Sequence, residues 1–431
     1  MIIFAKIAPD LLTNHQDMRE HTRSDLKTMK SKGFFWLMLM IVSLIIGMAF
    51  SQLIYTGIMQ KWGLALREVP FYAYPLLFIL AFYVTLFVHE MAHFLAFKIQ
   101  GIKLRALYLT MFVWVKQHKK WRFKIRPKLW VLFGGLVVPD LPPIKDQASY
   151  QKVLSAFAKS LIAAPVATLV FAACVLLTSI GLIGWSNNII WIGFFFIYML
   201  FNTAWTALYY ATFKLHTDSI YGDFVAFRNM KEDPVFALSQ VVQYTMFSTT
   251  ESQEADDFIM RLLEERIESL KINYTLFHHM LVIQYLEGLI EKGSVAPQTI
   301  HHKLISLAQH LPITNEQTWI LGHQLVLYFY QVQAIEEASN LWLRLIKRTH
   351  VSKLPERLLE YYEKKTEHMT FMADHDAYFL EDEHLYVGQM WIFEPVINPF
   401  EHERKSIYRL EKHIWECHIS HLLDGGEQKS D

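Results

Sequence analysis

The sequence has little of what holds small secreted proteins together. Its 431 residues include only two cysteines, Cys174 and Cys417, so a disulfide framework is excluded. It also lacks an excess of either charge, because Lys plus Arg and Asp plus Glu each number 41, which argues against a basic nucleic-acid-binding protein. It does not lack apolar side chains: 53% of the residues are hydrophobic and 15% aromatic, which excludes a disordered chain.

The neutral total hides an asymmetry along the chain. Residues 1–213 hold 21 basic and 8 acidic residues, a balance of +13. Residues 214–431 hold 20 basic and 33 acidic residues, a balance of −13. The first part also carries the long apolar runs, so the sequence predicts a membrane part followed by an acidic, soluble part.

Long stretches of the first part have no charged residue. None occurs between Lys32 and Lys61 or from residue 160 to residue 213, and an apolar run from 71 to 97 is interrupted only by one short polar group. A helix needs about 20 mostly apolar residues to cross the bilayer core. The sequence therefore predicts four membrane-spanning helices, at about residues 34–57, 71–97, 160–183 and 189–213.

Positive charge gathers in one loop between these predicted spans. Residues 98–128 contain ten Lys and Arg and no Asp or Glu. Because such loops remain in the cytoplasm, we expect this loop there, together with the basic N-terminal segment, residues 1–33. Four spans then place the C-terminal half in the cytoplasm as well.

The same loop carries a strand pattern. Residues 121–126 alternate apolar and basic side chains, which is the period of a half-buried strand. This predicts a β-hairpin at about 104–126 on the inner membrane surface, while a basic anchor for anionic lipid is an equally good interpretation. The apolar stretch at 129–139 is too short to span the bilayer, so we expect a re-entrant or interfacial segment.

The acidic part, residues 233–431, has the pattern of amphipathic helices. Apolar side chains recur at intervals of three and four between Phe258 and Leu270, and similar segments follow as far as residue 423. Helix pairs of this length favour an α-solenoid-like array. The expected fold is thus mainly α, with a polytopic membrane domain at 34–232, a small surface β-hairpin, and a soluble all-α domain that binds a protein partner.

The motif that carries chemistry is His89-Glu90-Met91-Ala92-His93, in the second predicted span. Residues four apart share one face of a helix, so His89 and His93 can bind one zinc ion, with Glu90 beside them as general base. Ionisable residues inside a span are costly and usually functional. Glu90 precedes Lys98 by eight residues, about 12 Å of helix, which predicts a site inside the bilayer near its cytoplasmic face.

A catalytic zinc ion normally takes three protein ligands and a water molecule. Our candidate for the third ligand is Asp218, which follows the last predicted span at its cytoplasmic end. Asp223 and His216 are its competitors. A carboxylate suits the site, because it lowers the charge of the zinc centre in a setting of low dielectric constant.

At these residues the chain resembles the site-2 protease family of intramembrane zinc metalloproteases, peptidase family M50. Besides HExxH, the segment Ala163-Ala164-Pro165-Val166-Ala167-Thr168 resembles the family's AGPxxN motif, with Thr168 at the Asn position. Thr217-Asp218-Ser219 resembles the family's aspartate motif, with Ser219 in place of Gly. The resemblance covers about residues 72–232, and it implies that His89, His93 and Asp218 hold the zinc ion. A second membrane-embedded HExxH family, which takes its third ligand from a glutamate, fits less well.

These observations predict a zinc endopeptidase that cleaves a membrane protein or membrane-associated peptide at or within the bilayer. We expect it in a bacterial cell membrane, with both termini cytoplasmic, in contact with lipid and with no nucleic-acid partner. Two other classes compete: a catalytically silent membrane scaffold, and a transporter component that uses the same polar residues for ion or proton passage.

Overall fold

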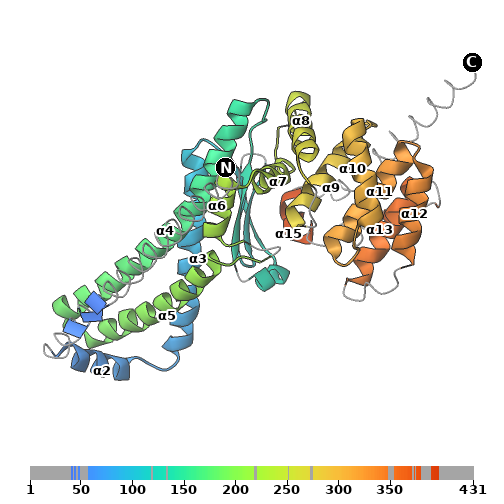
Figure 1. Ribbon diagram of the computed structural model, residues 1–431. Coiled ribbons are helices and arrows are strands. Elements are labelled where there is room, and N and C mark those ends of the chain that lie inside the picture. Colours follow the sequence, from blue (N-terminus) through green and yellow to red (C-terminus); the bar gives the residue numbers. More distant parts are fainter. Residues whose placement is uncertain are drawn as a thin grey trace, which may run out of the picture. The chain divides into compact units, whose positions relative to one another are not determined.

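The structure is a computed structural model of a mainly helical protein (Figure 1). It describes residues 57–117, 120–132, 134–217, 221–250, 252–271, 275–347, 354–370, 373, 375–379 and 390–397, together with residues 40, 41, 43, 44, 47 and 48.

Among the described residues, three helices are long and apolar enough to cross a membrane: α3 (Ala73–Ile99), α4 (Gln147–Trp185) and α5 (Ile189–Phe213). They match the second, third and fourth predicted spans. Helix α4 begins before the predicted start at residue 160, because the helix continues through its polar first turns. Most of the first predicted span, 34–57, lies outside the described residues.

The described chain forms two compact units. The first contains residues 175–200 and the described residues up to Leu77. Within it, α2 (Ile58–Glu68) packs Ala65 against Gly193, where a Cβ atom would overlap the Ala65 carbonyl oxygen. The Trp62 ring stacks on Phe196 with 4.4 Å between centroids. All the candidate site residues that the structure describes lie in the second unit, which holds the remainder of the chain.

The predicted hairpin at 104–126 belongs to a larger antiparallel sheet with strand order β3-β2-β1-β4. Its strands are β1 (Lys103–Leu109), β2 (Phe112–Gln117), β3 (Lys120–Ile125) and β4 (Gly135–Asp140). The expectation of a re-entrant segment at 129–139 is corrected here, because a 3₁₀ turn, η1 (Pro127–Leu132), returns the chain to β1 and the apolar run pairs with it as β4. Continuous apolar runs are typical of strands that are covered on both faces.

Both faces of this sheet are indeed covered. Leu107 and Val137 pair across β1 and β4 and belong to a core cluster that includes Phe97 of α3. The opposite face carries Ala106, Tyr108 and Val138, which are fully buried in a second cluster. The sheet is therefore a layer whose position depends on packing from two sides.

The acidic half is a series of helices: α6 (Asp223–Glu232), α7 (Pro234–Thr245), α8 (Gln253–Ser269), α9 (Leu276–Glu291), α10 (Gln298–His310), α11 (Glu316–Gln331), α12 (Ile335–Ile346), α13 (Glu356–Met369), α14 (Asp376–Phe379) and α15 (Met390–Ile397).

One contact between these helices recurs along the chain. Lys303 of α10 donates hydrogen bonds to carbonyl oxygens at the end of α8, at Ile267 and Leu270. At an interval of 41 residues, Arg344 of α12 donates to the carbonyl oxygens of Ala308 and Leu311 at the end of α10. Basic side chains stabilise helix C-termini in this way. The recurrence is what stacked helix pairs produce, and the solenoid itself stays a prediction.

Candidate metal centre

Helix α3 presents the two histidines of the HExxH motif to the same side. The helix is continuous from Ala73 to Ile99, so the interval of four residues places His93 one turn beyond His89. Their ring centroids are 4.9 Å apart. Both side chains lie inside the protein, with His89 7% exposed and His93 half-buried.

The third member of the group comes from the segment after α5. The chain reverses after Phe213, where His216 and Tyr221 form an isolated antiparallel bridge and the Gly222 N–H donates to the Leu215 carbonyl oxygen. Gly222 packs so closely on the last turn of α5 that a Cβ atom would overlap the Phe213 backbone. This reversal places Asp223 at the first position of α6.

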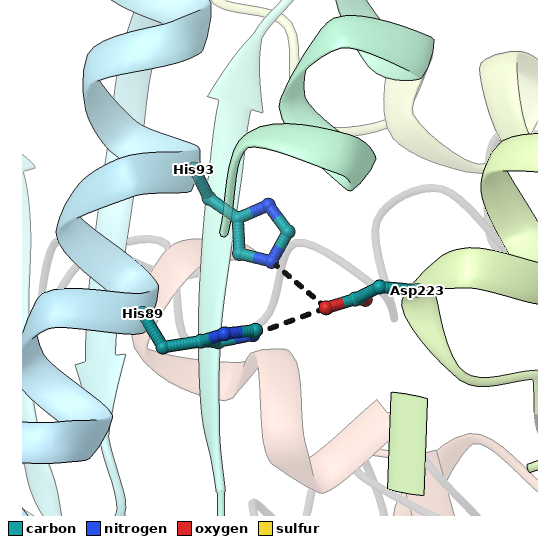
Figure 2. Close-up of side chains that lie close together, drawn as sticks. All are labelled: His89, His93 and Asp223. Carbon is teal, nitrogen blue, oxygen red and sulfur yellow. Dashed lines mark ion pairs between the residues drawn. The ribbon is translucent and has the colours of Figure 1, made fainter. Parts of the chain in front are cut away.

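Figure 2 shows both imidazoles directed at one carboxylate. The Asp223 Oδ2 atom lies 3.1 Å from His89 Nε2 and 3.6 Å from His93 Nε2. One ligand atom from each of these three residues lies within 4.8 Å of the others. Two imidazole nitrogens and a carboxylate oxygen are a common donor set for zinc. The donor atoms thus fit a divalent metal that keeps a further coordination position.

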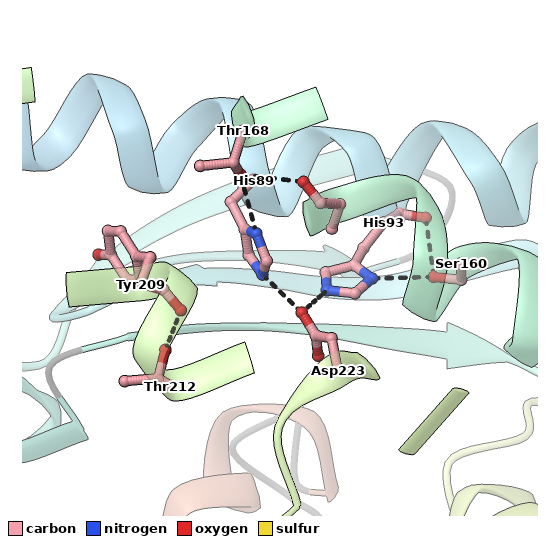
Figure 3. A network of polar contacts seen from close by, with 8 residues as sticks. His89, His93, Ser160, Thr168, Tyr209, Thr212 and Asp223 are labelled. Atoms are coloured by element: carbon pink, nitrogen blue, oxygen red, sulfur yellow. Dashed lines mark hydrogen bonds and ion pairs between the residues drawn. The ribbon is translucent and has the colours of Figure 1, made fainter. Parts of the chain in front are cut away.

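The other nitrogen of each imidazole has its own partner on α4 (Figure 3). His89 Nδ1 lies 3.1 Å from Thr168 Oγ1, whose hydrogen is donated to the Ala164 carbonyl oxygen. The hydroxyl can therefore only accept at His89, so in a neutral, metal-binding ring the proton is on Nδ1 and Nε2 is the nitrogen that binds the metal. His93 Nδ1 lies 3.1 Å from Ser160 Oγ in a similar arrangement. Such partners fix the ring orientation of metal ligands.

Two aromatic rings on α5 lie parallel to the His89 imidazole and cover one face of it. The Phe213 ring stacks on it with 5.0 Å between centroids, and the Tyr209 ring lies parallel to it at 6.2 Å. These apolar faces keep bulk water from one side of the site, which strengthens electrostatic interactions inside it.

The Asp223 carboxyl is suited to act as an anion. Burial raises its pKa, but the His89 and His93 imidazoles beside Oδ2 lower it more, so the pKa lies below its usual range. Its position at the start of α6 adds a favourable interaction with the helix dipole. The carboxylate is therefore ionised at neutral pH and able to bind a cation.

Glu90 is buried, with 4% of its surface exposed, and it lies against the first residue of β4. A Cβ atom on Gly135 would come within 2.6 Å of Glu90 Oε1 and closer still to the side-chain carbons. Only glycine leaves room for the Glu90 side chain at this position. The sheet is thus in direct contact with the proposed base.

A comparison with models of protein families supplies independent evidence, because residues 77–339 match peptidase family M50. The chain belongs to peptidase family M50. Its members are membrane metalloproteases, in agreement with the apolar helices and the metal-binding donor set described above. No curated protein and no solved structure matches the chain.

The M50 match differs in extent from the resemblance seen in the sequence. That resemblance ended near residue 232, whereas the family match continues to residue 339, within α12. The acidic helices up to that point therefore belong to the matched region.

The structure brings some of the predicted M50 site residues together. His89, His93 and Asp223 meet, and Glu90 adjoins them in the chain. Asp218 lies outside the described residues, so its role stays a prediction. In the part of the chain that the structure describes, His216 is not a member of the group, and its ring packs on Tyr221.

Four residues that contact the site were not predicted from the sequence: Ser160, Gly135, Tyr209 and Phe213. Ser160 precedes Thr168 by eight residues, about two helical turns, so both lie on a similar side of α4. The AGPxxN-like segment, which contains Thr168, therefore already indicated the side of α4 that faces the histidines. Gly135 and the stacking aromatics of α5 had no comparable signal, because a glycine pair and an aromatic-rich span are common in membrane proteins.

The contact at Gly135 leads to a prediction. The Gly135→Ala variant should lower turnover by roughly 10²-fold, the scale of a 1 Å misplacement of a catalytic group. The measurement is cleavage of fluorescently labelled casein, used as an extended polypeptide probe in detergent. Gly181→Ala is the matched control, because a Cβ atom there meets nothing within 4 Å. Equal activity of the two variants would show that Gly135 does not set the position of Glu90.

Proposed function

We propose that this protein is a zinc endopeptidase that cleaves peptide bonds at or within the membrane. The observation that carries the proposal is the convergence of His89 Nε2, His93 Nε2 and Asp223 Oδ2, beside Glu90, in a family of membrane metalloproteases. We assign His89, His93 and Asp223 as the zinc ligands and Glu90 as the general base.

A zinc ion held by these residues would polarise the scissile carbonyl group and lower the pKa of its water toward neutrality. Glu90 then accepts a proton from the attacking water and delivers it to the nitrogen of the leaving amine. Thr168 and Ser160 keep the imidazoles in the required tautomer. Phe213 and Tyr209 exclude water from one side of the His89 ring.

The substrate must reach this site in an extended form, because a helix hides its peptide bonds. Strand β4 is an edge of the sheet, and its first residue contacts Glu90. An added strand on that edge would place a peptide bond beside the base, as in β-strand addition. We therefore propose a transmembrane or membrane-associated peptide segment as the substrate, cut near the cytoplasmic face.

A silent scaffold or a transporter component is less well supported. A scaffold has no need for two imidazoles whose Nδ1 atoms are both held by hydroxyl groups. A transporter needs a polar route through the membrane, whereas the ionisable residues identified here gather at a single point.

Metal content gives the direct test. The purified protein should contain about one zinc ion per chain, and a strong chelator should abolish casein cleavage until zinc is restored. His93→Ala should lose both the metal and the activity. Cleavage that persists in the metal-free protein would rule out the proposal, and a metal-free purified protein that stays inactive with added zinc would favour the scaffold.

The orientation of the membrane part is a second proposal. With both termini cytoplasmic, a reporter enzyme fused after Asp431 should be cytoplasmic, and a reporter inserted at Asn187, between α4 and α5, should be external. The ten-charge loop at 98–128 is the reason. An external C-terminus would contradict this orientation, and a cytoplasmic Asn187 would contradict the antiparallel pair of spans.

A further inference from the structure

Helix α15 comes from the distant C-terminal part of the chain and packs on the sheet of the catalytic region. It spans Met390–Ile397, beyond the residues that match M50. Its Val396 is 1% exposed and belongs to the cluster on the sheet face away from α3, together with the partly buried Trp391, Ile392 and Phe393. The Phe393 ring lies 4.8 Å from that of Phe247, which also covers this face.

The surface beneath α15 cannot be left in water. Five of its side chains have no exposed area at all: Ala106, Tyr108, Val113, Val115 and Val138. They come from adjacent strands in one register, since Tyr108 pairs with Val113 and Ala106 pairs with both Val115 and Val138. A contiguous apolar face of this kind requires a cover. In the described part of the chain, α15 supplies several of the covering side chains.

A charged pair fixes α15 at the margin of this face. Arg126, just after β3, donates a hydrogen bond to Glu394 Oε1 at 3.1 Å. Both side chains are more than one-third exposed, so the pair contributes orientation more than stability.

Strand β4 links the covered face of the sheet to the proposed base, because neighbouring residues of this strand contact the two. Leu136 of β4 points to the α15 side, and its neighbour Gly135 contacts Glu90 on the other side. Successive residues of a strand face opposite sides of a sheet. Helix α15 lies against β2, and Leu136 and Val138 of β4 belong to the same apolar cluster, so a change in how that cluster packs would also reach Gly135 and Glu90.

We propose that α15 is an intramolecular clamp that positions Glu90 through β4. The segment that covers this sheet face is thus residues 390–397 of the same chain. Release of this segment from the sheet slows catalysis without removing the metal ligands. The clamp rests on the proposed role of Glu90, but its docking on the sheet can be observed independently of activity.

Val396→Asp tests the clamp by placing a charge in the buried contact. A reporter cysteine, Val113→Cys, is introduced under α15 in a chain whose Cys174 and Cys417 are replaced by alanine, and a water-soluble maleimide probes its accessibility. Ile346→Asp, at a position 45% exposed on α12, is the matched control. The clamp predicts slow labelling in the control and fast labelling with Val396→Asp. It also predicts a kcat for casein that is lower by roughly tenfold or more, with KM and zinc content unchanged.

Other outcomes overturn the clamp. Equal labelling with and without Val396→Asp would mean that α15 does not cover the sheet. Faster labelling with unchanged kcat would leave α15 a cover without a positioning role, and loss of zinc would make the effect general damage to the site. A charge exchange gives a second, smaller test: Arg126→Glu or Glu394→Arg sets two like charges at the margin of α15 and should speed labelling by roughly a few-fold at most, and the double variant should restore protection. If Glu90→Gln is fully active, the proposed function fails while the labelling result still stands.

Discussion

Glu90→Gln is expected to reduce casein cleavage by roughly 10²-fold or more, the usual scale for losing a general base. The substitution keeps the shape of a side chain that fits tightly against Gly135, so the site should not rearrange. The zinc ligands are untouched, and zinc content should remain at the level of the unmodified protein. Activity and metal content measured on one preparation therefore separate the base from the ligands.

The matched control for this variant is Glu336→Gln. Glu336 is exposed in the first turn of α12, outside the metal group, so the same loss of a negative charge there should leave activity and zinc content unchanged. Glu90→Gln with near-normal cleavage would refute the mechanism, whatever its metal content. A loss of zinc together with activity would instead show that Glu90 helps to hold the metal.

The histidine pair and the apolar helices α3, α4 and α5 could be predicted from the sequence because both depend on local spacing. His89 and His93 are one helical turn apart. The continuous apolar run around them predicts a helix, and in a helix this interval places both side chains on one face. Spans α3, α4 and α5 were predicted for the same reason, since length and the absence of charge are properties of a single segment.

The features that could not be predicted from the sequence are contacts between residues far apart in the chain. The run at 129–139 has the composition of a membrane segment, and only its pairing with β1 identifies it as β4. Likewise, the contact of Gly135 with Glu90 joins residues 45 positions apart. Helix α15 is a further case, because nothing in its eight residues indicates which surface they cover.

The sequence alone also could not decide between the two aspartates that follow α5. Asp218 and Asp223 both follow α5 within ten residues, and their spacing from the span favoured the first. The bridge between His216 and Tyr221 brings the Asp223 carboxylate back to α3, and it is closed by backbone contacts that leave no pattern in the sequence. Gly222 is the one local signal, because the close packing on Phe213 needs a residue without a Cβ atom.

Asp223→Asn is therefore expected to lose zinc and activity together. The variant keeps the size of the side chain but removes the charge that offsets the metal in a buried site. Loss of a residue that merely supports a ligand costs 10–100-fold in metal affinity, so loss of the ligand itself should exceed roughly 10²-fold. Zinc affinity measured by competition with a chelator, in detergent and at fixed pH, gives the number directly.

Asp218→Asn and His216→Ala are the controls, because both residues lie between α5 and α6 in the sequence and both substitutions remove a competing donor. Both should retain zinc affinity within a few-fold of the unmodified protein, because neither side chain is needed to complete the set of His89, His93 and Asp223. If Asp218→Asn loses the metal while Asp223→Asn keeps it, Asp218 is the third ligand, and the carboxylate at the start of α6 serves only to orient the two imidazoles. If both aspartate variants lose zinc, Asp218 supports the reversal that delivers Asp223. A distinction then follows from Gly222→Ala, which disturbs that reversal without removing a donor and should lower affinity by the same factor as Asp218→Asn.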